Sequence, residues 1–272
     1  MGLQRASRGS CRACRIDAVI VGLLIGKDRS TGVPGKNVRM IVGRPMAEYG
    51  FIAARAARVD HLFTSTDSAE IAGIGDRYGA QLVERPSALA TPEALTEDVL
   101  VHAGQEISKR LGYQPDLMVL LFANNPAIDV SLIMDGINCL QSDPTIDSAF
   151  SVCNYNMFTP NRARRVTDEG LIEPFVPLAL LGDDLSSIRG SQGDAYFCDL
   201  SVQVIRWRCL VNMDTGMQPF QWMGQRSKAL RNDYGFDVDS DWQFDVVEKW
   251  LRSRGFTEEH VPSDLGDPES WR

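Results

Sequence analysis

The chain has 272 residues, of which 44% are hydrophobic and 24% charged, a composition that excludes a disordered, collagen-like or disulfide-scaffold protein. Its formal net charge of −8 argues against a general nucleic-acid binder, although a local basic pocket for one nucleotide stays compatible. We therefore expect one large domain over residues 16–272, with small molecules as its partners.

Residues 1–15 are predicted to form a disordered basic arm. They contain four arginines and precede an apolar run at residues 18–25, an order that resembles a secretory signal. The run follows Asp17, ends in Gly-Lys-Asp-Arg rather than at a small-residue cleavage site, and is far shorter than the roughly 20 residues that cross a bilayer. We therefore expect a cytoplasmic protein with no membrane partner.

Short apolar runs then alternate with longer amphipathic segments, a pattern typical of an α/β sheet covered by helices. Strands are predicted at 17–24, 61–66, 81–84, 117–122, 148–153 and 195–205, and helices at 45–58, 68–78, 95–110, 130–141 and 240–252. Pro45 fits the first turn of its helix, where no N–H is needed. Ser68 is expected to open the second helix, and Asp239 or Ser240 to cap the last.

Residues 154–194 interrupt this alternation with three prolines and a basic cluster that contains Arg162, Arg164 and Arg165. An excursion of this length in an α/β domain is typical of a lid, a substrate loop or a dimer arm. The composition does not choose among the three.

The segment GKDRSTGVPGKN, at residues 26–37, joins glycines to cations directly after the first predicted strand. It is not a P-loop, because Ser30 replaces the first glycine and Asn37 the magnesium-binding hydroxyl. The glycine spacing of a dinucleotide-binding fingerprint is also absent. Two interpretations stay open: a loop that binds phosphates through backbone N–H groups and cations, with Lys36 as its main group, or a flexible surface loop.

Asp237 and Asp239 lie two residues apart and share one face if their segment is extended. Two adjacent carboxylates suit Mg²⁺, which takes one or two carboxylates together with phosphate oxygens. By itself the segment could equally be a helix cap with a spare acid. Combined with a phosphate-binding loop, the pair predicts a nucleotide-transfer site.

Four motifs in this order resemble those of the CMP-sugar synthetases, a family typified by N-acylneuraminate (sialic acid) cytidylyltransferase. They lie at residues 27–37, 65–67 (STD), 85–90 (RPSALA) and 237–240 (DVDS), and the likeness runs from about residue 16 to 252. The resemblance implies a Rossmann-like nucleotide-diphospho-sugar transferase fold, with a mixed, mostly parallel sheet flanked by helices. It also implies a small arm for dimerisation or substrate binding, exchanged across a homodimer.

The resemblance further implies transfer of CMP from CTP to the anomeric hydroxyl of an acidic, sialic-like nonulosonic sugar, with Mg²⁺ as cofactor and pyrophosphate as leaving group, in glycan biosynthesis. Such a reaction needs positioning and charge stabilisation, and a metal-activated hydroxyl needs no histidine base. The matched nucleotide contacts are Lys27, Arg29, Ser30, Lys36, Asn37, Asp67 and Arg85. The matched metal ligands are Asp237 and Asp239, and the catalytic groups are Lys27, Lys36 and Asp239.

The acceptor is assigned to Asn124, Asn125, Arg162 and Arg165. The segment FANNPAI at residues 122–128 stands where the family has QPTSPLR, and Thr31 stands where the family has a lysine. The first departure keeps open a different acid acceptor, such as an octulosonate, a phosphonate or a sugar phosphate. The second keeps open a catalytically silent homologue that binds a nucleotide.

Overall fold

The computed structural model describes residues 18–28, 32–182, 185–188, 190, 193–235 and 237–266. The predicted arm at residues 1–15, the predicted nucleotide contacts Arg29 and Ser30, and Thr31 lie outside the described residues.

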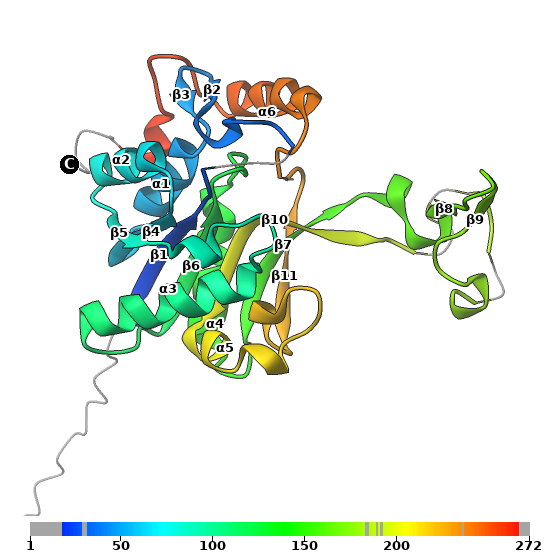
Figure 1. The fold of residues 1–272 in the computed structure, drawn as a ribbon, viewed down its shortest axis with the longest axis horizontal. Coiled ribbons are helices and arrows are strands. Elements are labelled where there is room, and N and C mark those ends of the chain that lie inside the picture. The colour runs from blue at the N-terminus through cyan, green and yellow to red at the C-terminus, as the bar shows by residue number, and fades with distance from the viewer. Residues whose placement is uncertain are drawn as a thin grey trace, which may run out of the picture.

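A seven-stranded sheet in the order β11-β7-β10-β6-β1-β4-β5 forms the centre of the molecule (Figure 1). The strands are β1 (Ile20–Ile25), β4 (His61–Thr66), β5 (Gln81–Glu84), β6 (Leu117–Phe122), β7 (Ser148–Asn154), β10 (Tyr196–Arg206) and β11 (Ser227–Asn232). Only β10 runs antiparallel to its neighbours β6 and β7, and the other neighbouring pairs are parallel. The sheet is therefore mixed and mostly parallel, as predicted.

Helices cover both faces of this sheet (Figure 1). They are α1 (Glu48–Ala56), α2 (Ala69–Arg77), α3 (Thr96–Leu111), α4 (Val130–Ser142), α5 (Trp207–Val211) and α6 (Asp241–Ser253). Alternate residues of β6 enter two separate cores, because successive side chains of a strand point to opposite faces. Val119 packs in the core shared with α1, α2, α4 and α6, and Leu120 in the core shared with α3 and α5.

Local capping signals explain where several helices begin. The Ser68 hydroxyl accepts from the backbone N–H of Ile71 and caps α2, as predicted. Ser240 and Gln243 form a capping box at α6, so Ser240 rather than Asp239 is the cap.

The predicted placement of Pro45 in the first turn of a helix is wrong. Pro45 lies in β3 (Arg44–Pro45), which pairs with β2 (Met40–Ile41), and α1 begins only at Glu48. Val42 and Gly43 have φ values of 44° and 74°, and positive φ at both central residues closes a two-residue hairpin turn. The hairpin therefore takes Pro45, the first residue that the sequence pattern assigned to the helix.

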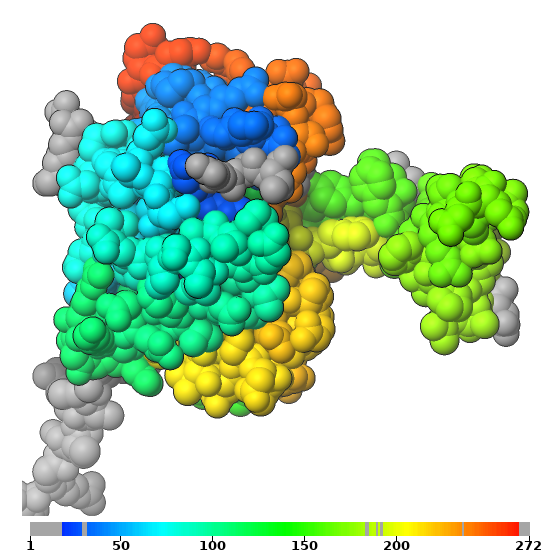
Figure 2. Space-filling view, viewed as in Figure 1, coloured from blue at the N-terminus to red at the C-terminus, as the bar shows by residue number. Residues whose placement is uncertain are grey.

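The excursion at residues 154–194 is an arm that projects from the side of the body (Figures 1 and 2). It continues from the ends of β7 and β10 and carries the antiparallel pair β8 (Arg164–Val166) and β9 (Ile172–Pro174). Among the described residues, no helix has the length and apolar character that a membrane span requires.

Candidate active site

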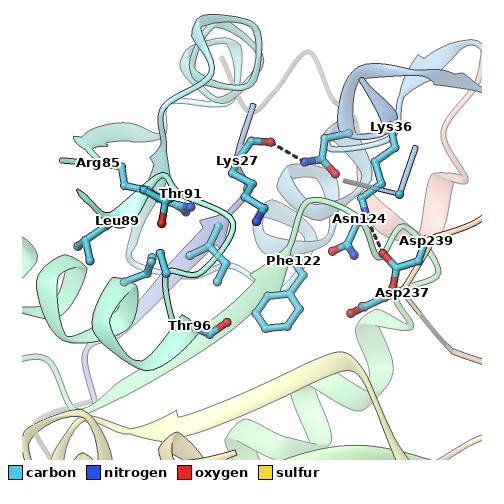
Figure 3. A pocket seen from close by; sticks show the side chains of 16 residues that line it. Lys27, Lys36, Arg85, Leu89, Thr91, Thr96, Phe122, Asn124, Asp237 and Asp239 are labelled. Carbon is cyan, nitrogen blue, oxygen red and sulfur yellow. Dashed lines mark hydrogen bonds and ion pairs between the residues drawn. The ribbon is translucent and has the colours of Figure 1, made fainter. Parts of the chain in front are cut away.

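A cavity of about 460 Å³ opens at the carboxyl ends of β1 and β6 (Figure 3). Its walls come from the loop after β1, the segment between β5 and α3, the end of β6 and the segment before α6. Ligands of α/β proteins bind at this edge, because the carboxyl ends of parallel strands and the loops that follow them meet there. The predicted site residues Lys27, Lys36, Asn37, Arg85, Asn124, Asp237 and Asp239 line this one cavity.

The end of the loop after β1, at Lys36 and Asn37, is packed into the site. Lys36 and Asn37 are each only 8% exposed, and the Asn37 side chain donates to the Lys27 carbonyl at 3.0 Å. A Cβ on Gly32 would lie 2.8 Å from the carbonyl oxygen of Asp239, so glycine permits the close approach of these two segments. The interpretation as an ordinary surface loop with solvated lysines is therefore wrong for Lys36.

Lys36 connects the loop to the acidic segment. Its ammonium donates to Oδ1 of Asp239 in an ion pair (Figure 3). The lysine side chain is 9% exposed and the aspartate side chain 65%, so the cation is held in the wall while the carboxylate faces the opening. Asp239 therefore stays accessible to a ligand.

Asp237 lies deeper than Asp239, and the Asn125 side chain donates to its Oδ1 at 3.3 Å. Burial, reinforced by the negative charge of Asp239, raises the pKa of Asp237 to about 7, against the opposing influence of Lys36. The nearby Lys36 ammonium therefore does not offset the effects of burial and of Asp239 on the Asp237 carboxyl.

This arrangement fits a divalent cation. Among the described residues Lys36 pairs with Asp239 alone, while burial and then the charge of Asp239 raise the pKa of Asp237, and an added cation would favour the ionised form of that carboxyl. In the described part of the chain no three His, Cys, Asp or Glu side chains gather into a metal site. A site for Mg²⁺ here would be completed by oxygens of the substrate phosphates and by water, as is usual for this ion.

Arg85 lies at the opposite end of the cavity, close to Leu89 and Thr91 (Figure 3). One guanidinium nitrogen donates to the Ser65 carbonyl at 2.8 Å, while Nε is buried and has no partner among the described residues. Burial lowers the pKa of Arg85, and the charge of Asp67 acts in the opposite direction. Arg85 thus brings a half-buried cation to this end of the cavity.

Asp67 does not line this cavity. Its Oδ1 accepts from the backbone N–H of Asp28 at 3.0 Å, and it borders a neighbouring cavity behind the loop, together with Lys27 and Asn37. In the structure Asp67 holds the loop, and its predicted contact with the nucleotide stays a prediction.

The four residues assigned to the acceptor do not assemble in this chain. Asn124 lines the cavity, but Asn125 is 1% exposed and lies beneath it. Arg162 donates to the Ser187 carbonyl, and Arg165 pairs with Glu173, both within the arm. The arm projects from the side of the body (Figure 1), and none of its described residues lines the cavity.

Sequence reasoning missed Thr91, Thr96 and Phe122 as lining residues. Phe122 is the last residue of β6 and its half-buried ring borders the cavity between Thr96 and Asn124 (Figure 3). Its place at the carboxyl end of a predicted central strand was a usable signal, because such ends face the ligand edge.

The fold and the cavity together place the chain in the class of α/β proteins whose ligands bind at the carboxyl edge of a mostly parallel sheet. Residues 28–170, more than half of the chain, match the family model described as cytidylyltransferase. The chain belongs to the cytidylyltransferase family.

Two relatives carry the name N-acylneuraminate cytidylyltransferase. The chain is 26% identical to the one from Escherichia coli over 151 residues and 23% identical to the one from Oncorhynchus mykiss over 238 residues. These matches cover 55% and 87% of this chain. The chain spans only 34% and 51% of the length of these two relatives.

A solved structure of CMP:2-keto-3-deoxy-manno-octonic acid synthetase in complex with CTP has a similar fold, with a TM-score of 0.62. The match covers 87% of this chain and 100% of the other, at 15% sequence identity. At that identity the likeness concerns the fold alone.

Proposed function

We propose that this protein transfers CMP from CTP to the anomeric hydroxyl of an acidic sugar of the nonulosonic class, with Mg²⁺, and releases pyrophosphate. The observation that carries the proposal is that one cavity holds Lys36, the pair Asp237 and Asp239, and the half-buried Arg85. Cations for phosphates, carboxylates for a metal and a donor for a base are the groups that a nucleotidyl transfer requires.

The two ends of the cavity would bind different parts of the substrates. Arg85 would bind the base, and Lys27 and Lys36 would bind the phosphates. Asp237 and Asp239 would hold Mg²⁺, which when bound supplies positive charge at the phosphates and acidifies the acceptor hydroxyl. The hydroxyl oxygen bonds to the α-phosphorus while the bond to the bridging oxygen breaks. Pyrophosphate leaves with that electron pair, and the hydroxyl proton passes to water.

The proposed class of acceptor rests on the names of the relatives. Two relatives are named for N-acylneuraminate, and the similar fold belongs to a synthetase named for an octonic acid. Both names describe sugar acids. We therefore place a nonulosonic acid first and an octulosonate second, ahead of phosphonates and sugar phosphates.

We further propose that the protein is a homodimer in which the arm reaches the partner's cavity. Six apolar side chains of the arm are each more than 60% exposed: Phe158, Val166, Ile172, Phe175, Leu180 and Ile188. An exposed apolar surface of this kind is typical of an interface. In such a dimer Arg162 and Arg165 would bind the carboxylate of an acceptor in the other subunit.

Pyrophosphate release tests the proposal directly. The purified protein is incubated with CTP, Mg²⁺ and one acid at a time: a nine-carbon sialic-type acid, an eight-carbon octulosonate, a simple phosphonate and a sugar phosphate. We expect turnover with the nine-carbon acid. Turnover of the phosphonate alone would reject a sugar acid as the acceptor in favour of a phosphonate. CTP binding measured by calorimetry, without pyrophosphate release with any acid, would favour a catalytically silent homologue that binds a nucleotide.

A further inference from the structure

Asp199 in β10 is a buried carboxylate whose hydrogen bonds come from neutral groups. It is 5% exposed, and its oxygens accept from the Ser151 hydroxyl at 2.5 Å, the Ser201 hydroxyl at 2.6 Å and the Ser201 N–H at 2.9 Å. The Cys153 thiol and the Asn232 amide add bonds at 3.1 and 3.2 Å. Burial raises the pKa of Cys153 to about 12, so this thiol stays a neutral donor. Burying a charge is costly unless it is hydrogen-bonded, and the five donors offset this cost for the Asp199 carboxylate.

The strand that carries Asp199 is irregular at this point. The pairing of β10 with β7 changes register between Cys198 and Gln203, and Leu200 has a φ of +59°. This left-handed conformation is unfavourable for a bulky residue and persists only where surrounding contacts enforce it. The bonds from Ser201 and Ser151 to the Asp199 carboxylate brace the bulge. Bulges of this kind often re-aim groups beside active sites.

The backbone of the bulge is connected to the candidate site by one side chain. The Asn125 amide donates to the Asp199 carbonyl at 2.9 Å and to Oδ1 of Asp237 at 3.3 Å. Asn125 is 1% exposed and follows the end of β6, so its backbone is fixed by the central sheet. Ser151 therefore holds the Asp199 side chain, and the Asp199 backbone carbonyl holds the Asn125 amide that bonds to Asp237.

We propose that Asp199 is a positioning residue that sets the orientation of the Asp237 carboxylate through Asn125. The inference rests on the proposed function in one respect, the assignment of Asp237 as a ligand of Mg²⁺. Groups that hydrogen-bond to a metal-ligating carboxylate fix its direction, and their loss typically weakens metal binding by roughly 10-fold to 100-fold. The bulge therefore serves the metal site, although Asp199 does not line the cavity.

Two serines of β7 give a matched test. Ser148 and Ser151 are both fully buried, and both hydroxyls donate strong hydrogen bonds. Ser148 donates to the Met223 carbonyl at 2.6 Å, whereas Ser151 donates to Asp199. The variants Ser148→Ala and Ser151→Ala remove the same group from the same strand. A merely structural role predicts similar losses of melting temperature and no difference in metal binding.

The measurement is the Kd of Mn²⁺, used as a spectroscopic probe, with CTP present and with no acceptor. We expect Asn125→Ala to raise this Kd roughly 10-fold or more, Ser151→Ala to raise it severalfold, and Ser148→Ala to leave it unchanged. The double variant Asn125→Ala/Ser151→Ala should bind Mn²⁺ no more weakly than Asn125→Ala, because the effect of Ser151 passes through Asn125.

Equal Kd values for the wild type, Ser151→Ala and folded Asn125→Ala would overturn the positioning role. A wild type that binds no Mn²⁺ would remove the metal assignment of Asp237 and this inference with it. The expected Mn²⁺ pattern in a protein that releases no pyrophosphate would refute the proposed reaction and leave the positioning role intact.

Discussion

Lys36 and Asp239 are separated by 203 positions in the chain, yet the lysine ammonium donates directly to the aspartate Oδ1. The pair joins the loop after β1 to the segment before α6 across the mouth of the cavity. A second ion pair nearby joins Arg39, just after the loop, to Asp241, the first residue of α6, but both of its side chains are well exposed. The chain thus contains a site pair and a surface pair that can be compared.

Replacing Lys36 should remove most of the activity. We expect Lys36→Met to lower kcat for pyrophosphate release roughly 100-fold or more, because a preorganised cation beside the reacting phosphates stabilises transition-state charge. Arg39→Met is the control and should keep activity within about twofold, since exposed ion pairs contribute little. Comparable losses in both variants would show that the loop as a whole, rather than the buried cation, matters.

Asp239→Asn should abolish Mg²⁺-dependent turnover while leaving the fold intact. The Asp239 side chain is 65% exposed and the amide oxygen of asparagine can still accept from the Lys36 ammonium, so the fold is kept, whereas the change removes a charged ligand of the proposed metal. Circular dichroism and the melting temperature report on the fold, and Asp241→Asn, in the first turn of α6, serves as the control. Unchanged Mg²⁺-dependent activity in Asp239→Asn would exclude this aspartate from the metal site.

The raised pKa of Asp237 predicts a pH-dependent response to metal. A carboxyl whose pKa rises from 3.8 to about 7 on folding holds a proton that the unfolded chain has released. The stabilisation from that proton is complete below about pH 4 and is lost as the pH rises through about 7. A divalent cation must displace this proton, so it binds more tightly as the carboxyl ionises.

We therefore expect Mg²⁺ to raise the melting temperature more at pH 8 than at pH 6. Without Mg²⁺, Asp237→Asn should melt above the wild type at pH 8, by about 2–4 °C for each kcal/mol that the variant gains. In that variant the response to Mg²⁺ should be weak at both pH values. A wild-type response of the same size at pH 6 and pH 8 would contradict the assigned titration.

The arm predicts the state of assembly. We expect a dimer by light scattering, and the double variant Ile172→Asp/Phe175→Asp should shift it to a monomer, because two charges would enter an apolar interface. Val211→Asp is the control, since Val211 is 61% exposed on α5 in the body of the molecule. A monomeric wild type at micromolar concentration would refute the homodimer.

Much of the fold could be predicted from local sequence. The predicted strands at 61–66, 81–84 and 117–122 match β4, β5 and β6, because short apolar runs bounded by polar residues carry the strand signal. No prediction covered β11, whose sequence SKALRN has no β-branched or aromatic residue and depends on its pairing with β7.

The sequence by itself determined which chemistry the chain carries: a loop with lysines after the first strand, an arginine after the third, and two carboxylates before the last helix. Only the tertiary structure decided how these groups meet. In the folded chain Lys36 contacts Asp239, although 203 positions separate them. Asp67 holds the loop after β1 outside this cavity, and Arg162 and Arg165 lie on the arm. The bulge at Asp199 is a further example. Hydrophobic periodicity predicts which face of the sheet a residue lies on, but only contacts between distant segments determine the direction of a carboxylate.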